Sequence, residues 1–301
     1  MPKDHTVYYD AFLLILANIF WGATDVAAKF ALAEMSPAAL LWARVSIALI
    51  TFLPVLWFRR KEIPRTLSGI LPFVGLGLSG FVLNFVLVYS GLRLAPASHA
   101  TALRVSESLA ILILAGIILR EKIRSRAIFG LGSGILGVIL VLNLDFKNLA
   151  LFTSGSRLGD LLILAGIIIE GFYTIIGKSV LKKVSPLLAT ALALFCGWLI
   201  LTVIFGARIG TEFAQQLPSA KSILACAYLG IVATSFGFWI YYVVLSRRQS
   251  HRVGISIMLQ PIVGIPLAAL VFHDHLTPRF LLGAALIALG VYLALGKNSN
   301  V

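Results

Sequence analysis

Long apolar runs alternate with short polar connections along almost the whole chain. A bilayer core about 30 Å thick is spanned by roughly 20 residues of α-helix, so an apolar run of that length predicts a transmembrane helix. The runs lack the strict polar–apolar alternation of barrel strands. The pattern predicts ten transmembrane helices, at residues 10–33, 37–58, 67–92, 97–119, 126–144, 159–181, 186–206, 218–245, 251–273 and 279–296.

Most of the positive charge lies in the connections between these runs. If the N-terminus is cytoplasmic, fifteen Lys and Arg fall in the inner connections and tails, and six in the outer ones. Cytoplasmic loops carry the excess of Lys and Arg in membrane proteins. We therefore expect both termini in the cytoplasm and the protein in the inner cell membrane. The first apolar run is longer than that of a cleavable signal peptide, which predicts a retained first span.

Composition agrees with a multi-pass membrane protein. Hydrophobic residues make up 59% of the 301 residues and charged residues only 12%, whereas about a quarter of a soluble domain is charged. The net charge of +13 is spread over short clusters, so it predicts no nucleic-acid-binding face. Cys196 and Cys226 lie within apolar runs, where a structural disulfide is not expected.

No enzyme signature is present. The chain lacks the serine-hydrolase elbow, the zinc-protease motif and the phosphate-binding loop, so we expect neither catalysis nor ATP hydrolysis, and no cofactor. The segment "HDH" at 273–275 has metal-binding side chains. Three adjacent residues rarely converge on one ion, so an exposed loop is the better interpretation and no metal site is predicted.

Two 17-residue segments resemble each other at a spacing of 149. Residues 21–37 read "WGATDVAAKFALAEMSP" and residues 170–186 read "EGFYTIIGKSVLKKVSP"; they share Gly at the second position, Lys at the ninth, Leu at the twelfth and a closing Ser-Pro. A second series recurs at a spacing of 153 and aligns Tyr89 with Tyr242 and Glu107 with Gln260. The chain therefore divides into two five-helix repeats, 1–148 and 149–301. An odd number of helices per repeat requires the second repeat to be inverted in the membrane.

These motifs resemble the drug/metabolite transporter superfamily in its ten-helix EamA-type branch. The residues that carry the resemblance are Trp21-Gly22, Lys29, Pro37 to Arg44, Glu121, Gly130, Gly137-Val138, Gly171, Lys178, Pro186, Pro261, Asp274, Gly283 and Gly290. Two positions depart from the pattern: Ser108 stands where the second half has Pro261, and Asp274 replaces a Glu. The resemblance implies a secondary carrier of small metabolites that exports its substrate. It leaves the substrate open, because relatives carry amino acids, nucleotides, vitamins and drugs.

Few charged residues lie within the predicted spans: Asp25, Lys29, Arg44, Arg104, Glu107, Glu170 and Lys178. Each costs roughly 2.5–3.5 kcal/mol at a helix centre and is therefore expected to face the protein interior. Glu170 lies eleven residues into its span and Glu107 about ten, which places both near the midplane. The repeat adds Trp21 and Gln260 to the same layer. Two carboxylates, an amide and an aromatic plate suit a small polar or zwitterionic solute, and these four residues are predicted to bind it.

Other residues have two open interpretations. Asp25 is deep enough to face the substrate cavity. Tyr173, one turn beyond Glu170, either hydrogen-bonds the substrate or anchors its helix at the membrane interface. Arg104 is three residues before Glu107, so the two either form a static pair on one helix face or act on the transport path. Lys29 and Lys178, at the outer and inner ends of their helices, either attract an anionic group or set helix depth by snorkelling.

The sequence therefore favours a secondary carrier, acting by alternating access, that exports amino acids or related compounds. An importer or exchanger of a larger anionic metabolite, such as a nucleotide-like or vitamin solute, is the alternative, and a non-transporting membrane protein is a third possibility. The expected partners are a small-molecule substrate, the lipid bilayer and a proton as candidate coupling ion, with the protein a monomer or homodimer.

Overall fold

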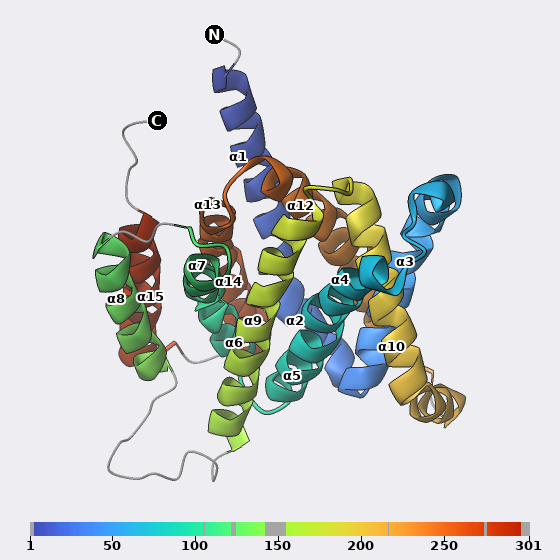
Figure 1. Ribbon diagram of the computed structural model, residues 1–301. Coiled ribbons are helices and arrows are strands. Elements are labelled where there is room, and N and C mark those ends of the chain that lie inside the picture. Colours follow the sequence, from blue (N-terminus) through green and yellow to red (C-terminus); the bar gives the residue numbers. More distant parts are fainter. Residues whose placement is uncertain are drawn as a thin grey trace.

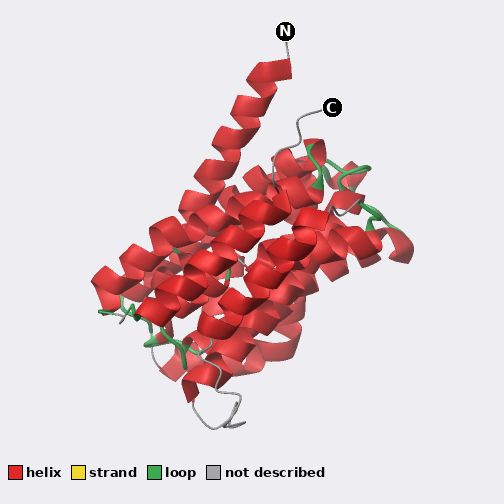
Figure 2. Cartoon of the chain, turned by 90° about the vertical axis from the view of Figure 1, so that its left-hand side faces the viewer, coloured by secondary structure: helices red, strands yellow, loops and turns green. Residues whose placement is uncertain are grey.

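A computed structural model describes residues 3–104, 106–121, 125–141, 155–215, 217–273 and 276–295. The described regular structure is helical throughout (Figure 1, Figure 2). The α-helices are α1 (Lys3–Gly22), α2 (Thr24–Leu32), α3 (Pro37–Phe58), α4 (Leu67–Gly77), α5 (Leu83–Leu92), α6 (Ala97–Leu103), α7 (Ser106–Ile118), α8 (Ser125–Val141), α9 (Gly155–Val180), α10 (Pro186–Gln215), α11 (Ala220–Ala227), α12 (Gly237–Arg247), α13 (Ser250–Gly254), α14 (Gln260–Phe272) and α15 (Pro278–Leu295). Two π-helices, η2 (Leu78–Val82) and η3 (Tyr228–Phe236), and two 3₁₀-helices, η1 (Arg60–Glu62) and η4 (Ile255–Leu259), complete them.

Several helical segments are long and apolar enough to cross a bilayer. Seven qualify within the described residues: Tyr8–Leu32, Pro37–Phe58, Leu67–Leu92, Ala97–Ile118, Ser156–Val180, Pro186–Gln215 and Ala220–Arg247. Gln260–Phe272 and Pro278–Gly290 are shorter apolar helices, and α8 has 17 residues. The chain is therefore a multi-pass membrane protein.

The helix ends follow local capping chemistry. α3 begins at Pro37, after Ser36, whose hydroxyl accepts a hydrogen bond from the Ala39 amide at 3.2 Å; Ser at the cap and Pro at the first position both favour a helix start. The predicted end of one span was wrong: the helix expected to end at residue 206 continues to Gln215. The added turns are polar on one side but keep Ile209 buried on the other, so packing continues after the apolar run has ended.

Two of the predicted continuous spans are interrupted by π-helical turns. η2 separates α4 from α5, and η3 separates α11 from α12. In η3 the hydroxyls of Thr234 and Ser235 donate to carbonyls five residues earlier, at 2.7 and 3.0 Å. Such segments widen a helix and re-aim its side chains, and they occur often at functional sites.

Close backbone contacts at glycines set the helix positions. α8 and α15 form a pair at one edge of the bundle (Figure 1). A Cβ on Gly137 would lie 2.5 Å from the carbonyl oxygen of Gly283, and one on Gly290 would lie 2.4 Å from that of Gly130. Small residues allow such contacts between membrane helices.

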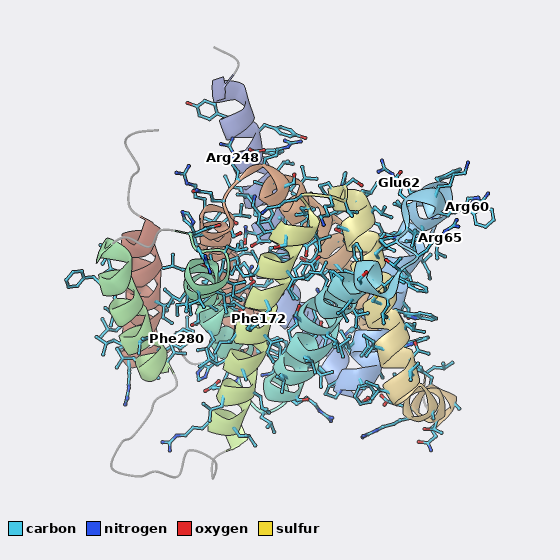
Figure 3. All side chains as sticks on the ribbon, in the orientation of Figure 1. Arg60, Glu62, Arg65, Phe172, Arg248 and Phe280 are labelled. Carbon is cyan, nitrogen blue, oxygen red and sulfur yellow. The ribbon has the colours of Figure 1, made fainter. Side chains whose placement is uncertain are left out.

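α9 crosses the middle of the bundle, packed along α5 and α7 (Figure 1). It approaches α5 closely at Gly166, where a Cβ would lie 2.6 Å from the Asn84 carbonyl oxygen. One turn later on α9 comes Glu170, which this approach carries into the centre of the protein. α1 begins and α15 ends toward the same end of the bundle (Figure 1). The charged side chains labelled in Figure 3, which are Arg60, Glu62, Arg65 and Arg248, lie toward that end.

Candidate functional site

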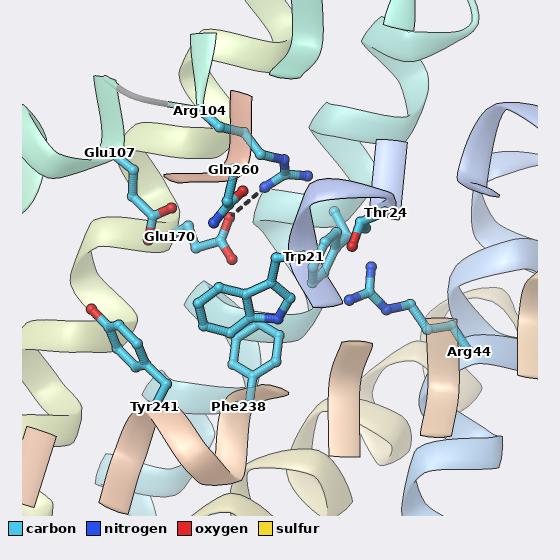
Figure 4. A pocket seen from close by; sticks show the side chains of 10 residues that line it. Trp21, Thr24, Arg44, Arg104, Glu107, Glu170, Phe238, Tyr241 and Gln260 are labelled. Carbon is cyan, nitrogen blue, oxygen red and sulfur yellow. Dashed lines mark hydrogen bonds and ion pairs between the residues drawn. The ribbon is translucent and has the colours of Figure 1, made fainter. Parts of the chain in front are cut away.

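A small cavity in the middle of the bundle gathers most of the predicted site residues. Its volume is about 20 Å³, which is room for about one water molecule. Lining side chains come from both halves of the chain (Figure 4): Trp21, Thr24, Arg44, Phe85, Arg104, Glu107, Glu170, Phe238, Tyr241 and Gln260. Of the predicted substrate-binding residues, Trp21, Glu107, Glu170 and Gln260 line it directly.

An ion-pair network centred on Arg104 forms one wall. Its Nε and Nη2 atoms donate to the Asp25 carboxylate, both at 2.9 Å, and its Nη1 donates to Glu170 Oε2 at 3.3 Å. Thr101 donates a further hydrogen bond to Asp25 at 3.3 Å. All of these side chains are buried. A bidentate Arg–carboxylate pair fixes both geometry and charge, so Asp25 contributes to the site by holding Arg104 rather than by lining the cavity.

Arg104 and Glu107 do not form the static pair that their sequence spacing allowed. α6 ends at Leu103 and α7 begins at Ser106, so the two residues are not on one continuous helix face. In the described part of the chain the ion pairs of Arg104 are with Asp25 and Glu170. Glu107 is 6% exposed, and its carboxylate points into the cavity (Figure 4).

Arg44, on α3, is a cavity residue that the sequence analysis did not assign to the site. It is fully buried. Its Nε donates to Thr234 and its Nη1 to Tyr89, both at 2.6 Å, and the guanidinium lies 4.0 Å from the centre of the Phe85 ring. Its Nη2 has no hydrogen-bond partner in the described structure. The signal in the sequence was a single arginine inside an apolar span; its neighbours could not be read from it.

The π-helix η3 positions two of the lining residues. Thr234, in η3, accepts the hydrogen bond from Arg44, and the adjacent Ala233 carbonyl accepts one from the Trp21 indole nitrogen at 2.8 Å. Trp21 also packs against Phe238 and Tyr241, with ring centroids 5.2 and 5.4 Å apart. Its polar atom is thus bonded to backbone, and the indole contributes an apolar plate.

Tyr173 lies beside the cavity and is absent from its lining. Its ring stacks on Tyr242, with centroids 4.7 Å apart, and meets Phe81 and Phe238 edge-on. Gly80 makes room for it, since a Cβ there would lie 2.2 Å from the Tyr173 ring. The structure therefore places Tyr173 in an aromatic cluster that supports the cavity.

The two predicted path lysines contact backbone carbonyls away from the cavity. Lys29 Nζ donates to the Ala95 carbonyl at 2.7 Å, and Lys178 Nζ donates to those of Leu245 and Arg248 at 2.8 and 2.5 Å. Carbonyls near helix ends lack intrahelical partners, and a lysine can satisfy them. The contacts join helices near the two ends of the bundle.

Other charged contacts accompany each lysine. Near Lys178, Asp10 pairs with Arg248 at 2.7 Å and His251 contacts Glu121. Toward the opposite end, His99 pairs with Asp160 at 3.1 Å. Burial raises and hydrogen bonding from His251 lowers the pKa of the Glu121 carboxyl, and the net effect is a lowered pKa.

The described residues contain no group of three or more His, Cys, Asp or Glu arranged to hold a metal ion. Of the segment 273–275, Asp274 and His275 lie outside them.

A family model matches most of the chain, over residues 9–143 and again over residues 157–296, and its description is EamA-like transporter family. The chain belongs to the EamA-like transporter family. Members of this family are membrane transporters, so the protein is a transporter of small metabolites.

Curated relatives of this EamA-like protein match over nearly their whole length. An "Uncharacterized transporter" of Archaeoglobus fulgidus is 26% identical over 290 residues, covering 95% of this chain and 98% of the relative. A "Probable amino-acid metabolite efflux pump" of Salmonella typhimurium is 24% identical over 291 residues, covering 94% of each. A protein of the same name from Escherichia coli is also 24% identical, over 293 residues.

A crystal structure of another protein has the same fold. It matches with a TM-score of 0.66 at 18% sequence identity, covering 95% of this chain and 96% of that chain. At this identity the likeness shows the fold alone.

Proposed function

We propose that this EamA-like transporter is a ten-helix secondary carrier built from two inverted five-helix repeats, 1–148 and 149–301. The boundary between them lies outside the described residues. Two observations support the repeat. The family model matches twice, and the π-helices η2 and η3 interrupt the third and eighth predicted spans.

A contact that recurs in the two halves supports it further. Lys29 and Lys178 are 149 residues apart, and Ala95 and Arg248, whose carbonyls they contact, are 153 apart. These are the two spacings of the sequence repeat. In an inverted pair the contacts fall at opposite membrane faces, where each holds two helices together, and the substrate site lies between them.

The substrate site in this proposal is the cavity, and its buried charge is the observation that carries it. Asp25, Arg44, Arg104, Glu107 and Glu170 are each at most 7% exposed. Charges at such depth are costly in a membrane protein and mark substrate or ion pathways. The cavity is smaller than any metabolite, so transport requires the helices around it to separate toward one side and then the other.

The transported substrate is an amino acid or related compound, and the direction is export. The names of the Salmonella typhimurium and Escherichia coli relatives support this choice. The alternative, a larger anionic solute, fits the site less well. The site holds three carboxylates and only two guanidinium groups, so an additional anion is disfavoured. Glu107 and Glu170 are the candidate carriers of a coupling proton. The protein lies in the inner membrane with both termini cytoplasmic, the side that Arg60, Arg65 and Arg248 mark.

Resistance of intact bacteria tests the proposal. Cells that produce the wild-type protein, Glu107→Gln or Glu170→Gln are exposed to growth-inhibiting amino acids, amino-acid analogues and nucleobases, with membrane levels of each variant measured. Glu62→Gln, at an exposed side chain, is the control. We expect resistance to one compound that both site variants lose and the control keeps.

Sensitisation in place of resistance would indicate uptake and favour the alternative. Full resistance in both site variants, at equal membrane levels, would show that the cavity is not the transport site.

A further inference from the structure

The cavity is lined by polar atoms of two kinds that have no hydrogen-bond partner in the described structure. Arg44 Nη2 is a cationic donor and Thr24 Oγ1 is a hydroxyl; both are unpartnered and buried. Gln260 Oε1 is an unpartnered buried acceptor. Buried polar groups are nearly always satisfied, so several in one cavity point to a ligand that supplies their partners.

The cationic atom belongs to an arginine whose direct contacts are all uncharged. No ion pair of Arg44 occurs in the described part of the chain. Its contacts are a threonine, a tyrosine and an aromatic ring. A buried guanidinium that has one nitrogen without a hydrogen-bond partner and no carboxylate at ion-pair distance is placed to receive an anion.

Arg104 differs from Arg44 because its charge is already paired with the carboxylates of Asp25 and Glu170. Its Nε, Nη1 and Nη2 atoms all donate to Asp25 or Glu170. Among the described cavity residues, the guanidinium nitrogen without a hydrogen-bond partner is therefore on Arg44, with the Thr24 hydroxyl beside it (Figure 4).

Acceptors lie on the other side of the cavity. In the view of Figure 4, Glu107 lies opposite Arg44, with Trp21 and Glu170 between them and Gln260 toward the Glu107 side. The hydrogen bond of Gln260 runs from Nε2 to Asn18 at 3.3 Å, which leaves its Oε1 for a donor. A carboxylate and an amide oxygen are the partners that an ammonium group requires. The indole of Trp21 between the two sides supplies an apolar contact for the rest of a substrate.

We propose that the cavity binds a zwitterion in one fixed orientation, with its carboxylate at Arg44 and Thr24 and its ammonium group at Glu107 and Gln260. This rests on the proposed transport function, and it narrows the substrate to small compounds that carry both groups, such as α-amino acids. Arg44 is then the residue that makes the carboxylate a requirement, and Glu107 the residue that makes the ammonium a requirement.

Binding to the purified full-length protein tests the orientation without depending on transport. Thermal stabilisation in detergent is measured with the proteinogenic amino acids, and the strongest ligand is compared with its primary amide, which lacks the anion, and its N-acetyl derivative, which lacks the cation. A hydrogen bond to a charged group is worth about tenfold or more in affinity. We expect the wild-type protein to bind the zwitterion at least about tenfold more tightly than either derivative.

Each variant should lose its preference for only one of the two charged groups of the ligand. Arg44→Gln should bind the amino acid no better than its amide, with the affinity for the amide unchanged. Glu107→Gln should bind the amino acid no better than its N-acetyl derivative. Arg44→Lys should recover part of the preference for the carboxylate, and Arg59→Gln, at a half-exposed side chain, should change neither ratio.

If Arg44→Gln does not purify as a folded protein, Thr24→Val carries the same test on the carboxylate side. Equal weakening of all three probes by the variants would show a structural role for Arg44 and overturn the proposal. Equal wild-type affinities, or no binding of any probe at millimolar concentration, would overturn it as well. Zwitterion binding with the expected preference over both derivatives, but without flux into liposomes, would refute the proposed transport function. The proposed orientation of the bound ligand would still be supported.

Discussion

Replacing Asp25 by Asn should destabilise the protein chiefly by leaving Arg104 without its main partner. The pair has two contacts of 2.9 Å and a third of 3.2 Å, with both side chains buried. Removing one member of a buried ion pair costs about 3–5 kcal/mol. Glu170 remains at 3.3 Å from Arg104, so we expect the lower end, about 3 kcal/mol.

The double variant Asp25→Asn/Arg104→Gln separates this cause from a general disturbance of the core. It removes both charges of the pair, so its loss of stability should be smaller than the sum of the two single losses by about 2 kcal/mol. Unfolding in mixed micelles of increasing SDS content, followed by circular dichroism, measures the free energy of unfolding of the wild-type protein, the two single variants and the double variant. Glu62→Gln, which breaks the exposed pair with Arg59 at 3.4 Å, should cost less than about 1 kcal/mol.

Additive single losses, with a coupling energy below about 0.5 kcal/mol, would refute this reasoning. The ion pair would then contribute nothing specific, and the cost of Asp25→Asn would have to come from altered packing.

Two further changes test a support of the site and a contact between the end of α2 and the start of α11. Gly80→Ala should destabilise the protein by about 1–3 kcal/mol, because its Cβ would lie 2.2 Å from the stacked Tyr173 ring. Gly132→Ala is the control and should not destabilise it, since a Cβ there meets no described atom within 4 Å. Equal losses of stability for the two variants in micelle unfolding would contradict this explanation. The Ser219 amide donates a hydrogen bond to the Glu34 carboxylate and lowers its pKa from 4.5. The contact therefore stabilises the fold above pH 4.5. This stabilisation is lost as the pH falls through the lowered pKa of the folded state. Glu34→Gln should reduce the pH dependence of thermal stability in that acid range, and unchanged profiles would argue against the contact.

The ends of many helices could be predicted because they depend on neighbours in sequence. Residues 37–58 and 67–92 were predicted as spans, and helical segments occupy the same limits. Apolar length, a capping Ser and a following Pro are local signals. The span that begins at Pro186 was predicted too short. Its last turns are stabilised by tertiary packing, which the pattern of apolar residues does not reveal.

The interior of the site was predicted in part. The depths of Glu107 and Glu170 follow from counting along a helix, and the repeat added Trp21 and Gln260. Which charges pair depends on rotations and crossings of helices, which the sequence does not contain. Arg44 was therefore missed as a lining residue.

The glycine contacts between α8 and α15 also constrain which substitutions this protein tolerates over evolutionary time. Gly137 faces the carbonyl of Gly283, and Gly290 faces that of Gly130. Since each glycine meets backbone, no change of side chain on the facing helix can make room for a larger residue. Gly137, Gly283 and Gly290 should stay glycine in related sequences, without compensating pairs. The exposed Phe129 on α8 should vary freely.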